Sequence, residues 1–178
     1  MNDRTQTRTG WLAPDEIETV RGQVPLVYVD AVPVRVDDLG RLTHVGLLLR
    51  AMADGTISRA VVSGRVLHGE RIRDALLRNL EKDLGPVALP RLPVEVSPFT
   101  VVEYFPDQGI TGFHDPRQHA VSLAFVVPVD GDCRPAENSL ELTWLTPDEA
   151  TRGDIRREMS SGHDRLVRMA LAHAGVLP

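Results

Sequence analysis

Three side chains at the end of residues 64–85, GRVLHGERIRDALLRNLEKDLG, have types and spacing that bear on metal or phosphate chemistry. Asn79, Lys82 and Asp83 fall within about 100° of one another on a helix, so they share one face. Carboxylates grouped on such a face bind Mg²⁺, a hard cation that takes oxygen ligands and bridges the protein to phosphate oxygens. Here the three side chains carry no net formal charge, and only Asp83 is well placed as a ligand.

The spacing of the whole segment resembles the signature of the Nudix superfamily. That signature reads G, any five, E, any seven, R-E, an aliphatic residue, any one, E-E, any one, G. Five positions fall in register: Gly64, Glu70, Arg78, Leu80 and Gly85. Asn79 and Lys82 stand where the family has two of its three metal-binding glutamates, and Asp83 stands at the third. The segment is therefore a Nudix-like frame with an altered metal site.

The resemblance implies an α/β fold, a Nudix-type α/β/α sandwich with a central mixed sheet. It also implies hydrolysis of compounds that join a nucleoside diphosphate to another group, with Mg²⁺ or Mn²⁺ activating water. Under this interpretation Glu70 and Asp83 are the catalytic candidates. Asp83 is the principal metal ligand, with Glu70 and the Gly64 carbonyl as further candidates. The ligand is a small diphosphate compound.

Lys82 opposes metal binding at this face. An ammonium about 5 Å from Mg²⁺ repels it by roughly 7 kcal/mol at an effective dielectric near 20. Glu81 does not compensate, because it points about 200° away from position 79. Lys82 can also swing its charge into solvent on its flexible stem. Carboxylates from other segments are the remaining candidate ligands: Glu103, Glu137 and Glu141.

A second hypothesis gives the face a cation in place of the metal. Lys82 would pair directly with a ligand phosphate, assisted by Arg65 or Arg78, and no cofactor would be needed. Each residue also has a structural interpretation. Lys82 can pair with a neighbouring acid, Arg78 can brace the loop through a carboxylate, and Glu70 can steady the loop and the start of the helix.

Three functions follow from these alternatives. The first is a Nudix-superfamily protein that accommodates a nucleoside-diphosphate-type ligand, with metal-dependent hydrolysis weak, altered or lost. The second is an active Mg²⁺-dependent pyrophosphohydrolase completed by carboxylates from outside the signature. The third is a non-catalytic sensing or interaction domain on the same fold.

A loop at residues 113–119 carries another possible site. His114, Asp115 and His119 have side chains that suit a metal or acid–base centre. The structural alternative is that Asp115 caps a turn and a histidine packs against its surroundings. The sequence favours the structural alternative.

Composition restricts the class of protein. The chain has 178 residues, a length that predicts one domain, residues 11–178, after a flexible tail at residues 1–10. A net charge of −5 argues against a nucleic-acid partner. Its apolar runs are far shorter than the roughly 18 residues of a membrane span. With a single cysteine, Cys133, and no secretion signal, we expect a cytoplasmic protein, which can form a homodimer.

Periodicity predicts the elements that position these residues. Apolar side chains recur every four residues at Ile72, Leu76, Leu80 and Leu84, which predicts an amphipathic helix over residues 70–84. A further N-terminal helix is expected at residues 11–23, and a C-terminal helical segment at residues 155–178. Thr146 begins a capping arrangement for another helix. Strands are expected at residues 24–36, 42–50, 57–62, 101–105, 120–129 and 140–145.

Overall fold

The structure of the chain, a computed structural model, describes residues 10–51, 55–135 and 139–178. The expected tail, apart from residue 10, and the candidate ligand Glu137 lie outside the described residues. Among the residues described, no helix is both long and apolar enough to cross a membrane. The elements, in chain order, are α1 (Pro14–Arg21), β1 (Leu26–Val36), β2 (Leu42–Ala51), β3 (Ile57–Ala60), β4 (Val62–Arg65), α2 (Ile72–Leu84), β5 (Thr100–Tyr104), β6 (Ala120–Pro128), β7 (Ser139–Leu145), α3 (Pro147–Ala150), α4 (Gly153–Arg157) and α5 (His163–His173).

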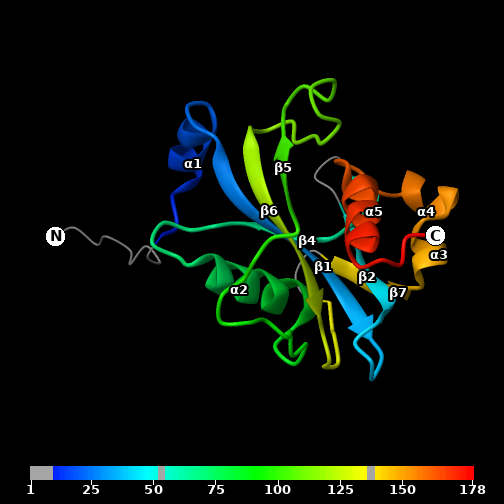
Figure 1. The fold of residues 1–178 in the computed structure, drawn as a ribbon. Coiled ribbons are helices and arrows are strands. Elements are labelled where there is room, and N and C mark those ends of the chain that lie inside the picture. Colours follow the sequence, from blue (N-terminus) through cyan, green and yellow to red (C-terminus); the bar gives the residue numbers. More distant parts are fainter. Residues whose placement is uncertain (1–9, 52–54, 136–138) are drawn as a thin grey trace.

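The strands form one mixed sheet, as the resemblance implied (Figure 1). Its main path runs β3-β2-β1-β6-β5, while β4 pairs with β1 and β7 pairs with β2. The β1–β6 pair is parallel, and the other pairs are antiparallel. The central strand β1 is thus held by β2, β4 and β6.

The prediction of a single strand at residues 57–62 is wrong in one respect. The structure divides it into β3, which pairs with β2, and β4, which pairs with β1. Val61 lies between the two strands and is fully buried. A run of β-forming residues does not specify its partners, so the sequence could not reveal this change of neighbour.

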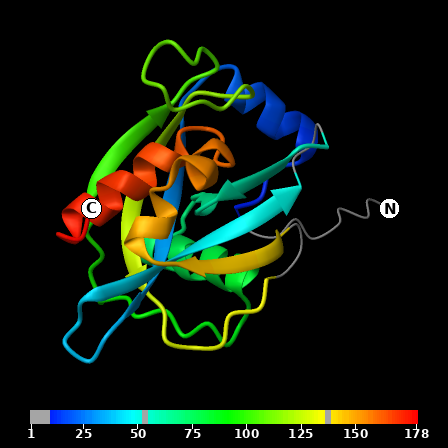
Figure 2. The same ribbon diagram turned by 90° about the vertical axis from the view of Figure 1, so that its right-hand side faces the viewer.

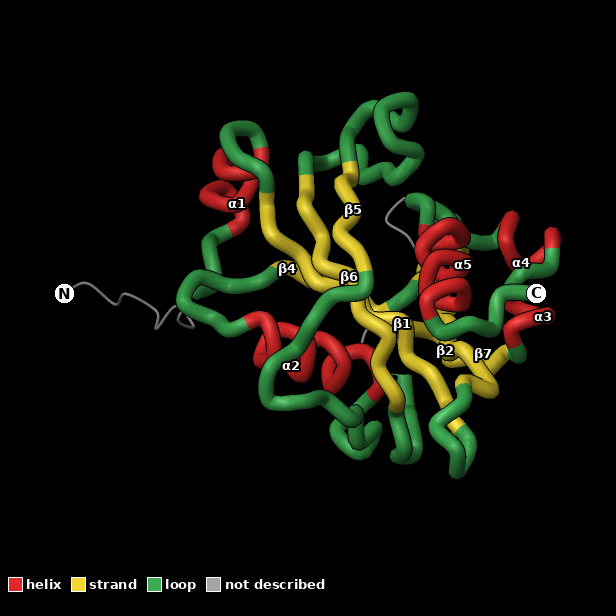
Figure 3. The backbone as a smooth tube through the Cα atoms, in the orientation of Figure 1, coloured by secondary structure: helices red, strands yellow, loops and turns green. Residues whose placement is uncertain are grey.

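Helices cover both faces of the sheet, which gives the expected three layers (Figures 1, 2 and 3). On β1, Val29 and Ala31 belong to the cluster packed around α2, while Val32 and Val34 belong to the cluster packed around α5. This alternation follows from the period of two along a strand. Each helix packs an apolar stripe against the sheet. The stripe of α2 consists of Ala75, Leu76, Leu80 and Leu84, and the stripe of α5 consists of Leu166, Val167, Ala170 and Leu171.

The expected ends of two helices are confirmed. Gly85 follows α2 with φ +89°, a left-handed conformation that favours glycine. Thr146 caps α3: its Oγ1 accepts a hydrogen bond from the Glu149 N–H at 3.3 Å, and the Glu149 carboxylate accepts the Thr146 N–H at 2.9 Å. Both signals are local, which is why the sequence predicts them well.

Candidate functional site

Glu70 and Arg78 brace the loop that precedes α2. Arg78 donates Nε–H to Glu70 Oε1 and Nη2–H to Oε2, each at 2.7 Å, and Nη2–H also to the Arg65 carbonyl at 2.8 Å. The Leu67 N–H donates to Glu70 Oε2 at 2.9 Å. Hydrogen bonding to Arg78 lowers the pKa of Glu70, an effect opposed by burial. The bracing interpretation is therefore confirmed, whereas the catalytic role of Glu70 and the ligand-binding roles of Arg65 and Arg78 stay predictions.

Asn79 is a buried packing residue. Its side chain donates Nδ2–H to the Ala75 carbonyl at 2.8 Å, and the residue is 2% exposed. Its amide lies directly against Gly64 on β4: a Cβ built on Gly64 would stand 1.8 Å from Asn79 Oδ1. At this position the Nudix signature has a carboxylate. Here an amide takes its place, and the N–H of that amide is hydrogen-bonded to the backbone of α2.

Asp83 is the buried acid of the signature, and cations hold both of its oxygens. Oδ2 forms an ion pair with Nη2 of Arg50, near the end of β2, and Oδ1 lies 3.4 Å from Nζ of Lys82. Arg50 was missed by the sequence analysis. A lone arginine in an apolar strand gives no signal that it will meet an acid on a distant helix.

The structure does not bring Glu103 or Glu141, the two described candidate ligands from outside the signature, to Asp83. Glu103 lies on β5, at the far end of the sheet path from β3, and its carboxylate is 3.6 Å from His119 Nε2. Glu141 stands opposite Leu49 on β2, and it accepts a hydrogen bond from Thr143 Oγ1 at 2.8 Å. Its neighbour Leu142 packs with the α2-side cluster, so alternation turns Glu141 toward the other face.

The donor set around Asp83 therefore does not fit a bound Mg²⁺ or Mn²⁺. Within residues 10–51, 55–135 and 139–178, no three histidine, cysteine, aspartate or glutamate side chains converge as a metal site. At the signature face itself, one carboxylate faces two cations, Arg50 and Lys82. A divalent ion needs an excess of anionic oxygen ligands, and this arrangement has the opposite balance.

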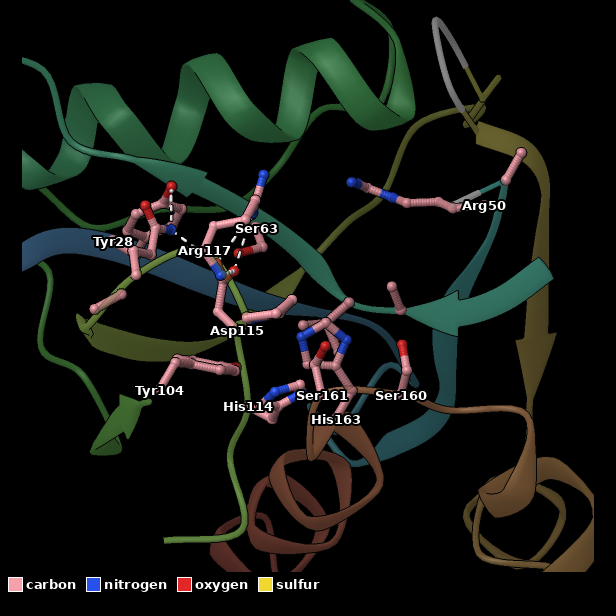
Figure 4. A pocket seen from close by; sticks show the side chains of 16 residues that line it. Tyr28, Arg50, Ser63, Tyr104, His114, Asp115, Arg117, Ser160, Ser161 and His163 are labelled. Carbon is pink, nitrogen blue, oxygen red and sulfur yellow. Dashed lines mark hydrogen bonds and ion pairs between the residues drawn. The ribbon is translucent and has the colours of Figure 1, made fainter. Parts of the chain in front are cut away.

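A pocket of about 530 Å³ opens beside this face (Figure 4). Its lining comes from the end of β2, from β3 and β4, from the loop at residues 114–118 and from residues 160–163 at the start of α5. In Figure 4, Arg50 borders the pocket on the side of α2, and His163 borders it on the side of α5. The polar and aromatic side chains that line it include Tyr28, Arg50, Ser63, Tyr104, His114, Arg117 and His163.

A hydrogen-bond network fixes the loop that covers the pocket. Asp115 accepts Nε–H and Nη2–H of Arg117, each at 2.9 Å, and Nε2–H of Gln118 at 2.8 Å. Burial raises the pKa of Asp115, but these bonds, chiefly from Arg117, outweigh it and the pKa is lowered. Gln118 also donates to Tyr28 Oη at 2.8 Å and accepts Nε–H of Arg21 at 2.9 Å. Helix α1 is thereby tied to the pocket.

The two histidines of this loop have different places. His119 stacks on Phe105, with ring centroids 4.3 Å apart. His114 lines the pocket, and its backbone N–H donates to the Ser161 carbonyl at 3.2 Å. Since Asp115 accepts the backbone N–H of Arg117 at 3.0 Å, the structural interpretation of the loop is confirmed: the acid caps a turn and a histidine packs on a ring.

Below the pocket, the sheet carries a buried carboxylate that the sequence analysis did not single out. Asp30, on the central strand, is fully buried and accepts a hydrogen bond from Tyr104 Oη at 2.8 Å. Tyr104 reaches it from β5 across small side chains on β6, among them Ala120 and Ser122. Burial and the Asp30 carboxylate raise the pKa of Tyr104 well above its ordinary value. In the sequence Asp30 interrupts an apolar strand, the one signal that could have drawn attention to it.

His163 covers this buried group from the start of α5. Its ring meets that of Tyr104 edge-on, with centroids 6.3 Å apart. Burial lowers the pKa of His163, although the nearby Asp30 carboxylate opposes the shift. In the described part of the chain, Asp30 Oδ1, Ser122 Oγ and His163 Nδ1 are buried without a hydrogen-bond partner. Such atoms are uncommon in folded proteins and gather at functional sites.

Comparison with known proteins places this geometry in a family. Residues 7–176 match the family described as Domain of unknown function (DUF4916). A crystal structure described as a possible asymmetric diadenosine tetraphosphate hydrolase from Jonesia denitrificans DSM 20603 is 62% identical. It covers 88% of this chain and 98% of its own, with a TM-score of 0.85. A comparison with curated proteins finds no significant match.

More distant structures share the fold. The NUDIX domain of Shewanella oneidensis NrtR, solved with ADP-ribose, is 17% identical with a TM-score of 0.61, and the match covers 84% of this chain and 88% of that one. A MutT NUDIX hydrolase from Burkholderia pseudomallei is 19% identical with a TM-score of 0.59, over 83% of this chain and 98% of that one. At these identities the likeness concerns the fold alone.

Proposed function

The chain belongs to the family described as Domain of unknown function (DUF4916) and has the fold of NUDIX domains, and from this premise we propose that it is a Nudix-superfamily protein that accommodates a small ligand of nucleoside-diphosphate type, with metal-dependent hydrolysis weak, altered or lost. One observation carries the proposal. The only carboxylate on the signature face, Asp83, is held by Arg50, and Arg50 also borders the pocket. Where the Nudix signature has an anionic metal site, this chain therefore has positively charged side chains at the edge of the pocket.

The size and lining of the pocket support a nucleotide-type ligand. A volume of about 530 Å³ falls within the roughly 300–1,000 Å³ typical of small-molecule sites. Arg50 and Arg117 offer the forked guanidinium donors that match phosphate oxygens. Tyr28 and Tyr104 offer aromatic surface near a buried polar group. A ligand with a charged phosphate end and a flat, polar remainder would use both parts.

The charge balance supports the loss or alteration of hydrolysis. A metal ion bound at Asp83 would meet Arg50 and Lys82 at short range, and the described residues bring no cluster of three metal-binding side chains there to offset them. Each unit charge about 5 Å from Mg²⁺ opposes it by roughly 7 kcal/mol at an effective dielectric near 20. Binding at millimolar metal releases only about 4 kcal/mol.

A second function, active hydrolysis, is favoured by one specific observation. The relative with 62% identity is described as a possible diadenosine tetraphosphate hydrolase. Under this alternative, Arg50 and Lys82 move away when substrate and metal bind, and Asp83 becomes a ligand. The substrate would be a dinucleoside polyphosphate.

Titration calorimetry with ADP-ribose and diadenosine tetraphosphate separates the two functions. We expect binding that persists in excess chelator, is lost in Lys82→Ala or Arg50→Gln, and is accompanied by little Mg²⁺-dependent cleavage. An exposed arginine on a surface loop provides the matched control, Arg91→Gln, whose Nε pairs with the equally exposed Asp130. Cleavage that Mg²⁺ accelerates and Asp83→Ala abolishes would establish the hydrolase instead. If neither binding nor cleavage occurs, the fold serves as a sensing or interaction domain.

A further inference from the structure

We infer that Arg50 stands in place of the divalent ion: its guanidinium closes Asp83 to metals and turns its remaining donors toward an anionic group in the pocket. The second half of this inference rests on the proposed function, because it needs a phosphate-bearing ligand. The first half concerns Asp83 alone and holds or fails independently.

The ion pairs place a positive charge beside each oxygen of Asp83, where a metal would have to bind. Oδ2 is bonded by Arg50 and Oδ1 faces Lys82 at 3.4 Å. The Asp83 side chain is 4% exposed, whereas those of Arg50 and Lys82 are 20% and 33% exposed. Of the two cations, Arg50 is the more enclosed and has the shorter contact. It is therefore the principal obstacle, although Lys82 is the residue that the sequence emphasises.

Local structure explains why Arg50 points at the helix. Leu48 packs in the cluster around α2, and side chains two residues apart on a strand share a face, so Arg50 continues that face beyond the apolar core. The pairing of β2 with β7 shifts register between Leu49 and Arg50. The extra residue of this irregularity, Leu140, belongs to β7, and β2 keeps regular pairs with β3 at Leu49 and Arg50, so the alternation holds at Arg50. The guanidinium also approaches the last turn of α2, where the helix dipole favours a positive charge.

As far as the described residues go, Arg50 has N–H donors left over that can face the pocket. A guanidinium has five N–H groups, and the described structure gives Arg50 a single hydrogen bond, from Nη2 to Asp83. Its Nε is buried and has no partner among the described residues. Arg50 lines the pocket together with Ser63 and Ser160 (Figure 4). A phosphate there can accept two parallel bonds from the same side chain.

Metal binding tests the first half. Asn79→Glu with Lys82→Glu restores the family's residues but leaves Arg50 in place, and a triple variant adds Arg50→Gln. By electron paramagnetic resonance with Mn²⁺ alone, we expect the triple variant to bind at least about tenfold more tightly than the double variant. A second triple variant with Arg41→Gln, an exposed turn residue, has the same formal charge and should behave like the double variant. Equal Mn²⁺ affinity of the double variant and the Arg50 triple variant would overturn the inference.

Anion binding tests the second half, with inorganic pyrophosphate in excess chelator as the probe. We expect Arg50→Gln to weaken binding at least about tenfold and Arg50→Lys to weaken it less. Asp83→Asn should keep or improve the affinity, because it releases the guanidinium from a competing carboxylate. Thermal unfolding of each variant identifies any loss that comes from misfolding. Unchanged affinity in a folded Arg50→Gln protein, or a loss of affinity in a folded Asp83→Asn protein, would refute an anion site at Arg50.

The two tests keep the inference apart from the proposed function. If the Mn²⁺ result is as expected but the protein binds neither pyrophosphate nor nucleotides, the metal-excluding role of Arg50 stands while the proposed function and the anion site both fail. If nucleotides bind and Arg50→Gln has no effect on pyrophosphate or Mn²⁺, the proposed function stands and the inference fails.

Discussion

Gly64 and Asn79 touch so closely that no other residue fits at position 64 without movement. A Cβ on Gly64 would lie 1.8 Å from Oδ1 and 2.3 Å from Cγ of Asn79. Gly64 stands in β4 opposite Val29, and Asn79 is buried in α2, so the contact sets the distance between the sheet and the signature helix. Here the glycine of the signature serves helix–strand packing.

Gly64→Ala should therefore destabilise the fold by about 1–3 kcal/mol, the usual range for overpacking a close-fitting interior. Adding Asn79→Ala should recover part of this loss, because it removes the atoms that clash. Urea unfolding of both single variants and the double variant gives the coupling energy. Gly22→Ala is the matched control, since Gly22 has φ −78° and its nearest neighbour in that direction is 3.6 Å away. Purely additive losses would show that the contact does not matter.

Glu70→Gln should lower the free energy of unfolding by about 1–2 kcal/mol at neutral pH, because it weakens a two-pronged bond to Arg78 in a partly buried loop. The pKa of Glu70 is lowered in the folded state. Its contribution to the free energy of unfolding is therefore fully present at pH values above the ordinary glutamate pKa, and it is lost as the pH falls through the lowered pKa of the folded state. The difference between wild type and variant should accordingly shrink in acid. Chemical unfolding at a series of pH values measures it.

The exposed pair of Arg91 and Asp130 supplies the comparison for that experiment. Its side chains are 53% and 54% exposed, so Asp130→Asn should change stability by less than about 0.5 kcal/mol. Equal effects of the two substitutions would contradict the bracing role of Glu70.

Gln118→Leu should destabilise the loop over the pocket. The side chain is 1% exposed and joins Arg21, Tyr28 and Asp115, so the apolar variant leaves three polar groups short of a partner. We expect a loss of about 2–4 kcal/mol. Hydrogen exchange at residues 114–118 should also become faster. Gln23→Leu, at an exposed position, should alter neither quantity, and unchanged exchange in Gln118→Leu would argue against the network.

His163 should make the protein less stable in mild acid. Its pKa is lowered by burial, so the folded state favours the neutral ring and binds fewer protons than the unfolded state. Its contribution is therefore present above about pH 6.5, the ordinary value, and decreases as pH falls below it. Unfolding free energies at about pH 7.5 and 5.5 should differ less in His163→Gln than in wild type. His68→Gln, at an exposed position, is the control. A His163 ring that titrates by NMR above its ordinary value would contradict this prediction.

Much of the fold could be predicted because its signals are local. The four-residue stripe of α2, the glycine after it and the cap at Thr146 each depend on neighbours within one or two helical turns. The division of residues 57–65 into β3 and β4 could not be predicted, because it depends on which distant strands accept them. The local periodicity of a segment does not specify which distant strand it pairs with.

The candidate site was predictable only in part, for the same reason. The signature located Glu70, Arg78 and Asp83 correctly within one segment, since their spacing is fixed by a single helix and its loop. The residue that forms the ion pair with Asp83 Oδ2 is Arg50, which comes from β2, far away in the sequence. Tyr104 and Asp30 meet across the sheet in the same way. The spacing of residues along the sequence predicts side chains that lie together on one helix or loop. It does not predict side chains that the sheet brings together from distant segments.

The parallel pairing of β1 with β6 has a consequence for biosynthesis. It places Leu26 beside Ala120. During synthesis, the central strand β1 therefore cannot pair with β6 until β2, α2 and β5 have left the ribosome. Until then one edge of an apolar strand stays open to other chains. Nascent chains that stall before residue 120 should consequently be substrates for holding chaperones, and truncation there should yield inclusion bodies rather than a smaller folded protein.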